Sequence, residues 1–281
     1  MTMLTENDVI WHCHDDRTSR DAAVVDIAQD QILNYLHKQG FFSRGLVLSG
    51  SAALRKYRGG IRARFSPDLE FSTPDGGLAG WTLAALSDID LGGFHVQTEI
   101  ADERHARLHI RAPFEWPVVE TNIDISSDPL RLRPKTLDPV PVEVHWSYGF
   151  PMPSLPVIRA EEDIADRLIR FSASGMPRDL YDLAWYAARP FDEDLVRRLW
   201  VLKMYVQSRL DHREEPIDPS DISHGAQGAD KLPEAVASWI VTVQLRYVFL
   251  TDLTMDEQRW CRLDPADEAD VAHALAALSF R

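Results

Sequence analysis

Residues 50–71 read GSAALRKYRGGIRARFSPDLEF, and this stretch decides how the chain folds. The apolar run just before it predicts a buried strand over residues 45–49. Gly50 and Ser51 then predict a tight turn that opens a helix over residues 51–57, because glycine tolerates the backbone conformations that such turns require. The paired glycines that follow predict the end of this helix. A buried strand, a glycine turn and a helix start therefore come in direct succession.

The end of the same stretch predicts a second strand, over residues 68–72. Side chains alternate between the two faces of a strand, so Asp68 and Glu70 share one face. Two carboxylates on one strand face form a paired oxygen-ligand site of the kind that suits Mg²⁺, which also binds substrate phosphates. The alternative is that both are solvated acids on an exposed face.

A third carboxylate, Asp124, lies on a later predicted strand between Ile123 and Ile125. If that strand neighbours the first, Asp124 completes a site for one or two metal ions of the kind that promote phosphoryl displacement. Glu120 shares the alternation phase of Asp124 and is the second choice. A plain exposed strand residue is the alternative for Asp124.

The Gly50-Ser51 turn is suited to a phosphate group. Glycine lets a phosphate approach the backbone closely, a serine hydroxyl can add a hydrogen bond, and helix N-terminal amides favour an anion. An ordinary strand-to-helix turn has the same sequence, so the turn indicates a phosphate site only together with the carboxylates.

Five cations lie within ten positions of this stretch: Arg55, Lys56, Arg58, Arg62 and Arg64. The whole chain carries a net charge of −14, so the cluster is a local reversal of sign. It predicts contact with nucleotide or RNA phosphates. A solvated helix face followed by a loop is the equal alternative.

The rest of the chain divides into a mixed half and a helical half. In the first half, helices are predicted over 17–39 and 77–86, and strands over 94–100, 106–111, 118–125 and 140–146. The stiff PMPSLP stretch at 151–156 predicts a boundary. After it, helices are predicted over 160–174, 178–188, 194–210, 233–253 and 265–279. We therefore expect an α+β domain over residues 1–156, with a mixed sheet and flanking helices, followed by a helical domain over 157–281.

The composition is that of an ordinary globular protein of 281 residues, with 45% hydrophobic and 26% charged side chains. It excludes wholesale disorder, and the negative charge excludes a generally basic protein that coats nucleic acid. No signal peptide and no stretch of about 20 apolar residues is found. Two cysteines are too few for a disulfide framework. The sequence predicts a cytoplasmic protein that does not use a membrane.

Two blocks of the sequence resemble one known family. GSAALR at 50–55 and SPDLEF at 66–71 resemble the nucleotidyltransferase signature of a strand, a turn, a helix and a strand with paired acids. More specifically, they resemble the AbiEii/AbiGii toxin family, the nucleotidyltransferase-like toxins of type IV toxin–antitoxin systems. ADRL at 165–168 and RDLYDL at 178–183 are similar to later motifs of that family, in the same order. The resemblance covers roughly residues 30–190.

The resemblance implies a nucleotidyltransferase-like fold and an enzyme that uses an NTP and releases pyrophosphate. It implies that Asp68 and Glu70 hold one or two Mg²⁺ ions, and Asp124 is the expected third ligand. The residues assigned to the NTP are Gly50, Ser51, Arg55, Ser66 and Arg178. The residues assigned to catalysis are Asp68, Glu70, Arg167, Asp179 and Asp182. Of the last two, Asp182 is preferred, because the helix dipole alone accounts for an acid at Asp179. Lys56, Arg58, Arg62 and Arg64 are assigned to RNA.

Some relatives add nucleotides to the 3′ end of tRNA and thereby stop translation, so the resemblance also implies an RNA acceptor such as tRNA, and a cognate antitoxin. Two departures leave alternatives open. Glu70 stands where the family has Asp, and Arg167 stands where it has Lys. The alternatives are a transferase that modifies a small molecule or a protein, and a degenerate domain that binds an NTP or a partner without catalysis.

Overall fold

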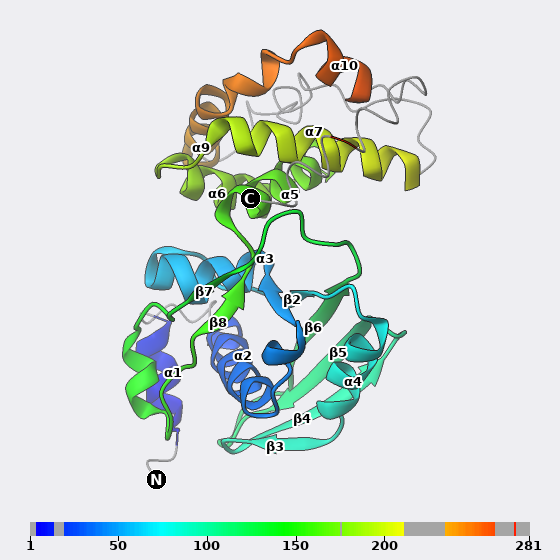
Figure 1. The fold of residues 1–281 in the computed structure, drawn as a ribbon. Coiled ribbons are helices and arrows are strands. Elements are labelled where there is room, and N and C mark those ends of the chain that lie inside the picture. The colour runs from blue at the N-terminus through cyan, green and yellow to red at the C-terminus, as the bar shows by residue number, and fades with distance from the viewer. Residues whose placement is uncertain (1–3, 14–19, 175, 211–233, 262–272, 274–281) are drawn as a thin grey trace. The chain divides into compact units, whose positions relative to one another are not determined.

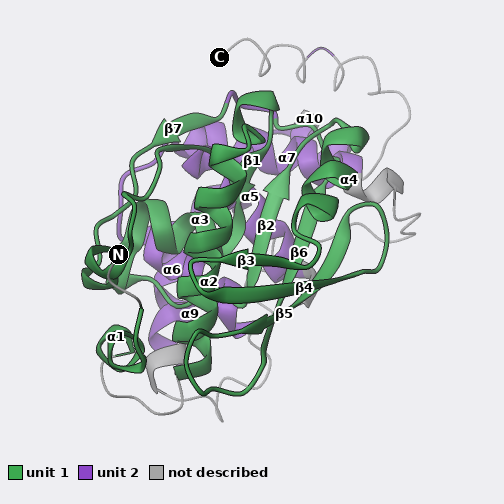
Figure 2. Cartoon of the chain, turned by 90° about the horizontal axis from the view of Figure 1, so that it is seen from below, with its two compact units in different colours: residues 1–130, 134–158 green, residues 131–133, 159–281 purple. Residues whose placement is uncertain are grey.

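A computed structural model of the chain describes residues 4–13, 20–174, 176–210, 234–261 and 273. The chain forms two compact units, which Figure 2 distinguishes by colour. Unit 1 comprises residues 1–130 and 134–158, and unit 2 comprises residues 131–133 and 159–281. This division falls two residues after the boundary expected from PMPSLP, and it also gives the short segment 131–133 to the second unit.

Unit 1 combines four helices with a single mixed sheet in its described residues (Figure 1). The helices are α1 (Glu6–His12), α2 (Arg20–Lys38), α3 (Gly50–Leu54) and α4 (Gly76–Ala85). The strands are β1 (Val47–Ser49), β2 (Asp68–Ser72), β3 (Ile89–Leu91), β4 (Phe94–Ile100), β5 (His105–Arg111), β6 (Val119–Ser126), β7 (Lys135–Leu137) and β8 (Leu155–Val157). Their order across the sheet is β3-β4-β5-β6-β2-β1-β8-β7. The expected α+β architecture is confirmed.

The two faces of the sheet differ in polarity, as strand alternation requires. One face is apolar and packs in a single core with residues of α2 and α4. That core includes Leu69 and Phe71 of β2, and Leu108 of β5. The opposite face of β4, β5, β6 and β2, which we call the outward face, carries the polar residues of each strand at exposed or half-buried positions.

Most predicted elements of unit 1 form where the pattern placed them. β2 and β4 have the predicted bounds, and α2, α4, β5 and β6 differ by a few residues at most within the described part of the chain. The helix after Gly50 is shorter than predicted, because α3 passes into a π-helical turn over Arg55–Gly59. Since one helical turn changes its hydrogen-bonding pattern here, the side chains of residues 55–59 are redirected relative to a regular helix.

The strand predicted over 140–146 is wrong. Its second half forms a 3-10 helix, η5 (Glu143–Ser147), which packs against α1. Pro141 has no N–H to give to a sheet, and the N–H of Val140 donates to the carbonyl of Lys56 at 2.8 Å. Strands β7 and β8 form on either side of this segment, and β8 includes part of the PMPSLP stretch that we expected to be irregular. The sequence analysis also missed β3.

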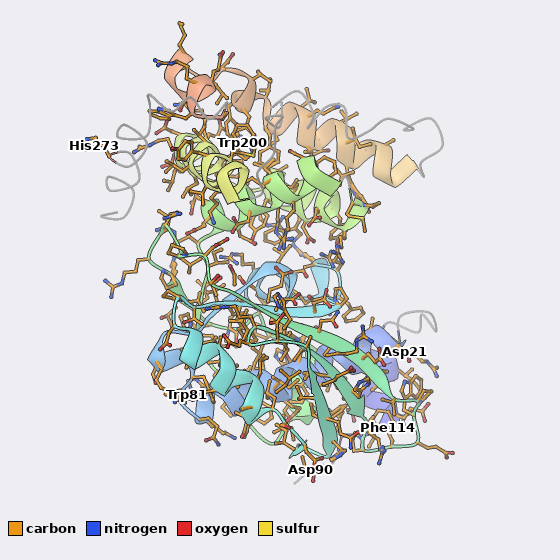
Figure 3. The ribbon with its side chains drawn as sticks, turned by 90° about the vertical axis from the view of Figure 1, so that its right-hand side faces the viewer. Asp21, Trp81, Asp90, Phe114, Trp200 and His273 are labelled. Carbon is orange, nitrogen blue, oxygen red and sulfur yellow. The ribbon has the colours of Figure 1, made fainter. Side chains whose placement is uncertain are left out.

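Unit 2 is helical in the part that the structure describes. Its helices are α5 (Ala160–Ser174), α6 (Pro177–Ala187), α7 (Glu193–Leu210), α9 (Glu234–Arg246) and α10 (Met255–Cys261). α5 packs against α6 and α7, and α9 packs against α6. Trp200 of α7 is fully buried among them (Figure 3). The helix predicted over 233–253 ends at Arg246 and is followed by a 3-10 turn, and the helix predicted over 265–279 lies outside the described residues except for His273.

Candidate active site

Three carboxylates lie beside one another on the outward face of unit 1. β2 pairs with β6 in parallel, and the register places Glu70 opposite Asp124 and Asp68 opposite Asn122. The three acids are half-buried, and opposite residues on neighbouring strands have Cβ atoms about 5 Å apart. Parallel pairing of two strands about fifty residues apart therefore assembles the carboxylates that the sequence had placed on separate elements.

The turn after β1 lies directly against the carboxylate of Glu70. Gly50 has a φ of +67°, a conformation that residues with a Cβ rarely adopt. A Cβ at residue 50 would lie 2.3 Å from Cδ of Glu70 and 2.5 Å from its Oε2. The cause is the antiparallel pairing of β1 and β2, which sets Ser49 opposite Glu70. Gly50 is therefore required twice, for its backbone conformation and for the space that the Glu70 carboxylate occupies.

The three neighbouring carboxylates concentrate negative charge on this face. Burial raises the pKa of Asp124, the charges of Asp68 and Glu70 raise it further, and His105 acts in the opposite direction. Asp68 accepts a hydrogen bond at its Oδ1 from Nδ2 of Asn122 at 3.0 Å. The three acids therefore repel one another across the two strands.

These residues fit a magnesium ion that is bound together with a substrate phosphate. No cluster of three or more His, Cys, Asp or Glu side chains around one metal position is found in the residues that the structure describes. Proteins commonly hold Mg²⁺ by one or two carboxylates together with waters and substrate phosphates, however, rather than by a cage of protein ligands. A cation among Asp68, Glu70 and Asp124 would offset the repulsion that raises the pKa of Asp124.

Ser51 and Ser66 connect the glycine turn to the start of β2. Their hydroxyl oxygens lie 2.7 Å apart, and the Ser66 hydroxyl donates to the carbonyl oxygen of Asp68 at 2.7 Å. Both side chains are buried. Gln29 of α2 donates to the carbonyl of Ser66 at 3.1 Å. The two serines, which we expected to bind the NTP, thus lie beside the carboxylates and hold the turn against the strand.

The cationic cluster is divided by the fold, and its first two members are buried. Nζ of Lys56 lies 2.8 Å from Oδ1 of Asp26 and 2.7 Å from Oδ1 of Asp30. Arg55 donates to the carbonyls of Gly60 and Ala63 at 2.6 and 2.7 Å and pairs with Asp26 at 3.6 Å. These partners occupy both side chains inside unit 1. We therefore correct the assignment of Lys56 to RNA and of Arg55 to the NTP.

The two acids that hold Lys56 were missed by the sequence analysis. Burial favours a higher pKa for Asp26, but the Lys56 ammonium, His12 and Arg55 outweigh it and hold the pKa well below its usual range. The pKa of Asp30 is lowered in the same way, against the effect of burial, chiefly by Lys56. The sequence does contain a signal for this pair, because Asp26 and Asp30 are four residues apart on a predicted helix and therefore share one face of it.

The other three cations of the cluster have different surroundings. Arg58 donates to the carbonyl of Ile158 and is half-buried. Arg64, also half-buried, donates to the carbonyl of Phe65 at 3.2 Å, and Arg62 is exposed. Only part of the expected RNA-binding strip is therefore presented at the surface.

The second sequence block forms a buried ionic group in unit 2. Arg167 of α5 is fully buried, and its guanidinium pairs with Asp182 of α6 and, at 3.3 Å, with Asp163 one helical turn earlier. Tyr186 donates to Asp163 at 2.6 Å. Asp163 was not among the expected residues, although it lies four residues before Arg167 on the same helix, the spacing at which side chains meet.

The two remaining residues of that block lie at the start of α6. Asp179 is buried, and Arg170 lies 3.8 Å from it. Burial raises the pKa of Asp179, and Arg170 and Arg167 act against this. Arg178 is exposed. The structure thus brings Arg167 together with Asp182, the acid that the sequence analysis preferred.

A pocket of about 380 Å³ opens where β2 and β6 begin. It is lined by the first residues of α2, by Phe65 to Pro67 and by Val118 to Glu120. Asp21 at its rim accepts a hydrogen bond from the indole of Trp116 at 2.9 Å, and the Trp116 ring meets Phe114 edge-on. Figure 3 labels Asp21 and Phe114 on this side of unit 1. The pocket directly adjoins the segment that leads into Asp68.

The carboxylate pair, the glycine turn and the second ionic group all lie within the part of the sequence that matches a known family. Residues 31–240 match the model of the nucleotidyl transferase AbiEii toxin family of type IV toxin–antitoxin systems. The chain belongs to this AbiEii family.

The chain is also similar to proteins of known structure. The chain is similar to MenT4, a nucleotidyltransferase toxin from Mycobacterium tuberculosis H37Rv, with 36% sequence identity and a TM-score of 0.88. The match covers 98% of this chain and 99% of MenT4. JHP933 from Helicobacter pylori is also similar, at 17% identity and a TM-score of 0.41 over 80% of this chain and 94% of that protein. No curated protein matches the sequence significantly.

Membership of the AbiEii family confirms the resemblance drawn from the two motif blocks. The matched region extends beyond the blocks in both directions and includes most of α2 as well as α7. None of the described helices of this AbiEii protein is both long and apolar enough to cross a membrane.

Proposed function

We propose that this AbiEii protein is a Mg²⁺-dependent nucleotidyltransferase that moves a nucleotide from an NTP to an RNA acceptor such as the 3′ end of tRNA. In this proposal it acts in the cytoplasm as the toxin of a pair, and a cognate antitoxin holds it in check. The observation that carries the proposal is the outward face of unit 1, where Asp68, Glu70 and Asp124 lie on two paired strands and Glu70 contacts the Gly50 turn.

The chemistry requires in-line attack of an acceptor hydroxyl on the α-phosphorus of the NTP. A new P–O bond forms, the bond between the α-phosphorus and the bridging oxygen breaks, and pyrophosphate leaves. A magnesium ion supplies charge stabilisation for the phosphates when it is bound. Protein groups contribute mainly by positioning and by electrostatics in reactions of this kind.

Each residue of the site has a distinct part in this proposal. Asp68 and Glu70 would hold the metal ion, and the absence of a side chain at Gly50 leaves room for the Glu70 carboxylate. Asp124 completes the carboxylate set beside Glu70, and its carboxylate is the proposed acceptor of the proton that the acceptor hydroxyl loses. Ser51 and Ser66 fix the turn against β2. Arg167 is fully buried in unit 2 and pairs there with Asp182, so its proposed part is to hold the second sequence block together.

The proposal is tested by incubating the full chain with labelled NTPs, Mg²⁺ and total tRNA. Labelled RNA is the expected product. Label on a protein or a small molecule would instead support a transferase with another acceptor, and NTP binding without transfer would support a degenerate domain. Glu70→Gln and Asp68→Asn should each abolish the labelling of RNA. Glu143→Gln removes an exposed carboxylate of η5 and is the matched control. Full transfer by the Glu70 variant would refute the carboxylate assignment.

A further inference from the structure

A second set of cations lies on the outward face of unit 1, outside the cluster at residues 55–64. The burial of β5 alternates strictly, with Ala106, Leu108 and Ile110 buried. The residues between them are basic and point outward: His105, Arg107, His109 and Arg111. Outward neighbours on a strand are about 7 Å apart, so these four residues form a track of basic side chains about 20 Å long, in which Arg107 and Arg111 are the permanent cations.

The register places this track directly beside the carboxylates. β5 pairs antiparallel with β6, which sets His105 opposite Asp124 and Arg107 opposite Asn122. On the other side of β6, Asp124 is opposite Glu70 and Asn122 is opposite Asp68. Because neighbouring strands lie about 4.8 Å apart, the track runs about 10 Å from the strand that carries the proposed metal ligands.

The two arginines of the track have no ionic partner in the described residues, whereas the two histidines do. His109 lies 3.4 Å from Glu99 and 3.1 Å from Glu120, and His105 lies 2.8 Å from Asp102. The side chains of Arg107 and Arg111 are exposed and make no ion pair or hydrogen bond with any residue that the structure describes, although Glu99 of β4 lies opposite Arg107 in the sheet. Arginines of this kind are available to an anionic partner.

We infer that the outward face of β5 binds the phosphate backbone of the RNA acceptor, with Arg107 and Arg111 as the main contacts. This inference rests on the proposed function and specifies its acceptor site. Two observations commit it to RNA. Arg107 and Arg111 are positively charged in a chain of net charge −14, and the track ends beside the carboxylates, where the 3′ end of an RNA strand must react. A polyanion lying along β5 would reach Asp124 with its terminal hydroxyl.

The inference is tested by the binding of a fluorescein-labelled single-stranded RNA with a free 3′-hydroxyl, measured by anisotropy in the absence of NTP and Mg²⁺. Arg107→Glu combined with Arg111→Glu should weaken binding at least tenfold. Arg107→Ala and Arg111→Ala should each reduce the slope of log K against log salt by about 0.7. Lys135→Glu is the control, because Lys135 is an exposed cation of β7 at the far edge of the same sheet.

A second measurement separates this inference from the proposed function. In the transfer assay, the double variant should raise KM for tRNA while KM for the NTP stays unchanged. If the wild type transfers nucleotides to RNA and the variants bind RNA as tightly as the wild type, the β5 surface is wrong and the function stands. If RNA binding depends on the arginines but no transfer is detected, the surface stands and the function is wrong. If the arginine variants lose binding to a protein partner but bind RNA as tightly as the wild type, the inference is also wrong.

Discussion

Cδ of Glu70 lies only 2.3 Å from the position that a Cβ of residue 50 would take. The Glu70 carboxylate thus lies where the side chain of any other residue at position 50 would be. Only glycine, which has no Cβ, can stand at this turn. Because Gly50 also has a φ of +67°, the site depends on this residue for space and for backbone conformation. The carboxylate and the turn must therefore act as a unit.

Gly50→Ala should impair catalysis more than it impairs folding. The side chain would displace the Glu70 carboxylate, and misplacement by about 1 Å can lower a rate about a hundredfold. The backbone strain should lower the free energy of unfolding by about 1–3 kcal/mol. Nucleotide transfer and urea unfolding check the two effects. Gly80→Ala is the matched control, because the space around Gly80 is open and alanine in helix α4 should add about 0.5–1 kcal/mol of stability. Equal activity of both variants would contradict the role of Gly50.

Asp124→Asn should stabilise the fold while it lowers activity. The raised pKa of Asp124 means that the folded state binds this proton more tightly than the unfolded chain does. The stability that comes from protonated Asp124 is therefore present at low pH, and it is lost as the pH rises through the pKa of Asp124 in the folded state. At pH 7 the variant should gain about 0.5 kcal/mol, the scale of exposed charge pairs, and this gain should vanish near pH 3.

The check is urea unfolding at pH 7 and pH 3, with and without Mg²⁺. The metal should stabilise the wild type more than Asp124→Asn, because it offsets the same repulsion. Transfer by the variant should fall at least about a hundredfold if Asp124 takes the hydroxyl proton. A variant that is less stable than the wild type at pH 7 would argue against charge repulsion at this face.

Lys56→Met should be severely destabilising. It leaves Asp26 and Asp30 buried without the ammonium that lies within 2.8 Å of both, and breaking such a group lowers stability by about 3–5 kcal/mol. The pKa of Asp26 is lowered against the effect of burial, so the stability from its charge is present above the unfolded pKa and lost as the pH falls through the folded one. The deficit of Lys56→Met should therefore shrink in acid, as the two acids become protonated.

Thermal or urea unfolding of Lys56→Met at pH 7 and near pH 4 measures this deficit. Lys135→Met, on an exposed strand, should change stability by less than about 0.5 kcal/mol. Adding Asp26→Asn to Lys56→Met should restore part of the loss. A Lys56→Met protein as stable as the wild type would show that the ionic group does not hold α2 against the π-helical turn at residues 55–59.

Arg167→Lys and Arg167→Met separate charge from packing in unit 2. Lysine keeps the positive charge beside Asp182 and Asp163 but loses the planar guanidinium, so Arg167→Lys should retain more transfer than Arg167→Met and less than the wild type. Methionine removes the guanidinium charge from beside these two buried acids and should lower stability by about 3–5 kcal/mol. Transfer assays at a temperature where circular dichroism shows both variants folded are the measurement. A folded Arg167→Met protein with full activity would remove Arg167 from the catalytic group.

The sequence by itself determined the local features of the site. Alternation along one strand placed Asp68 and Glu70 on a common face, because that periodicity belongs to any extended chain. The need for a glycine between a buried strand and a helix also followed from local backbone geometry. The family resemblance then followed from two short blocks and matches the family that the whole chain belongs to.

The tertiary structure alone shows which charged side chains are buried in ion pairs and which lie exposed beside the carboxylates. The five cations at residues 55–64 looked like one surface strip, but Lys56 and Arg55 are buried against α2, since acids distant in sequence neutralise them there. Arg107 looked like an ordinary strand residue until the register of β5, β6 and β2 set it in one row with Asp68. Burial and strand register depend on contacts between residues far apart in the chain, and a local pattern cannot specify them.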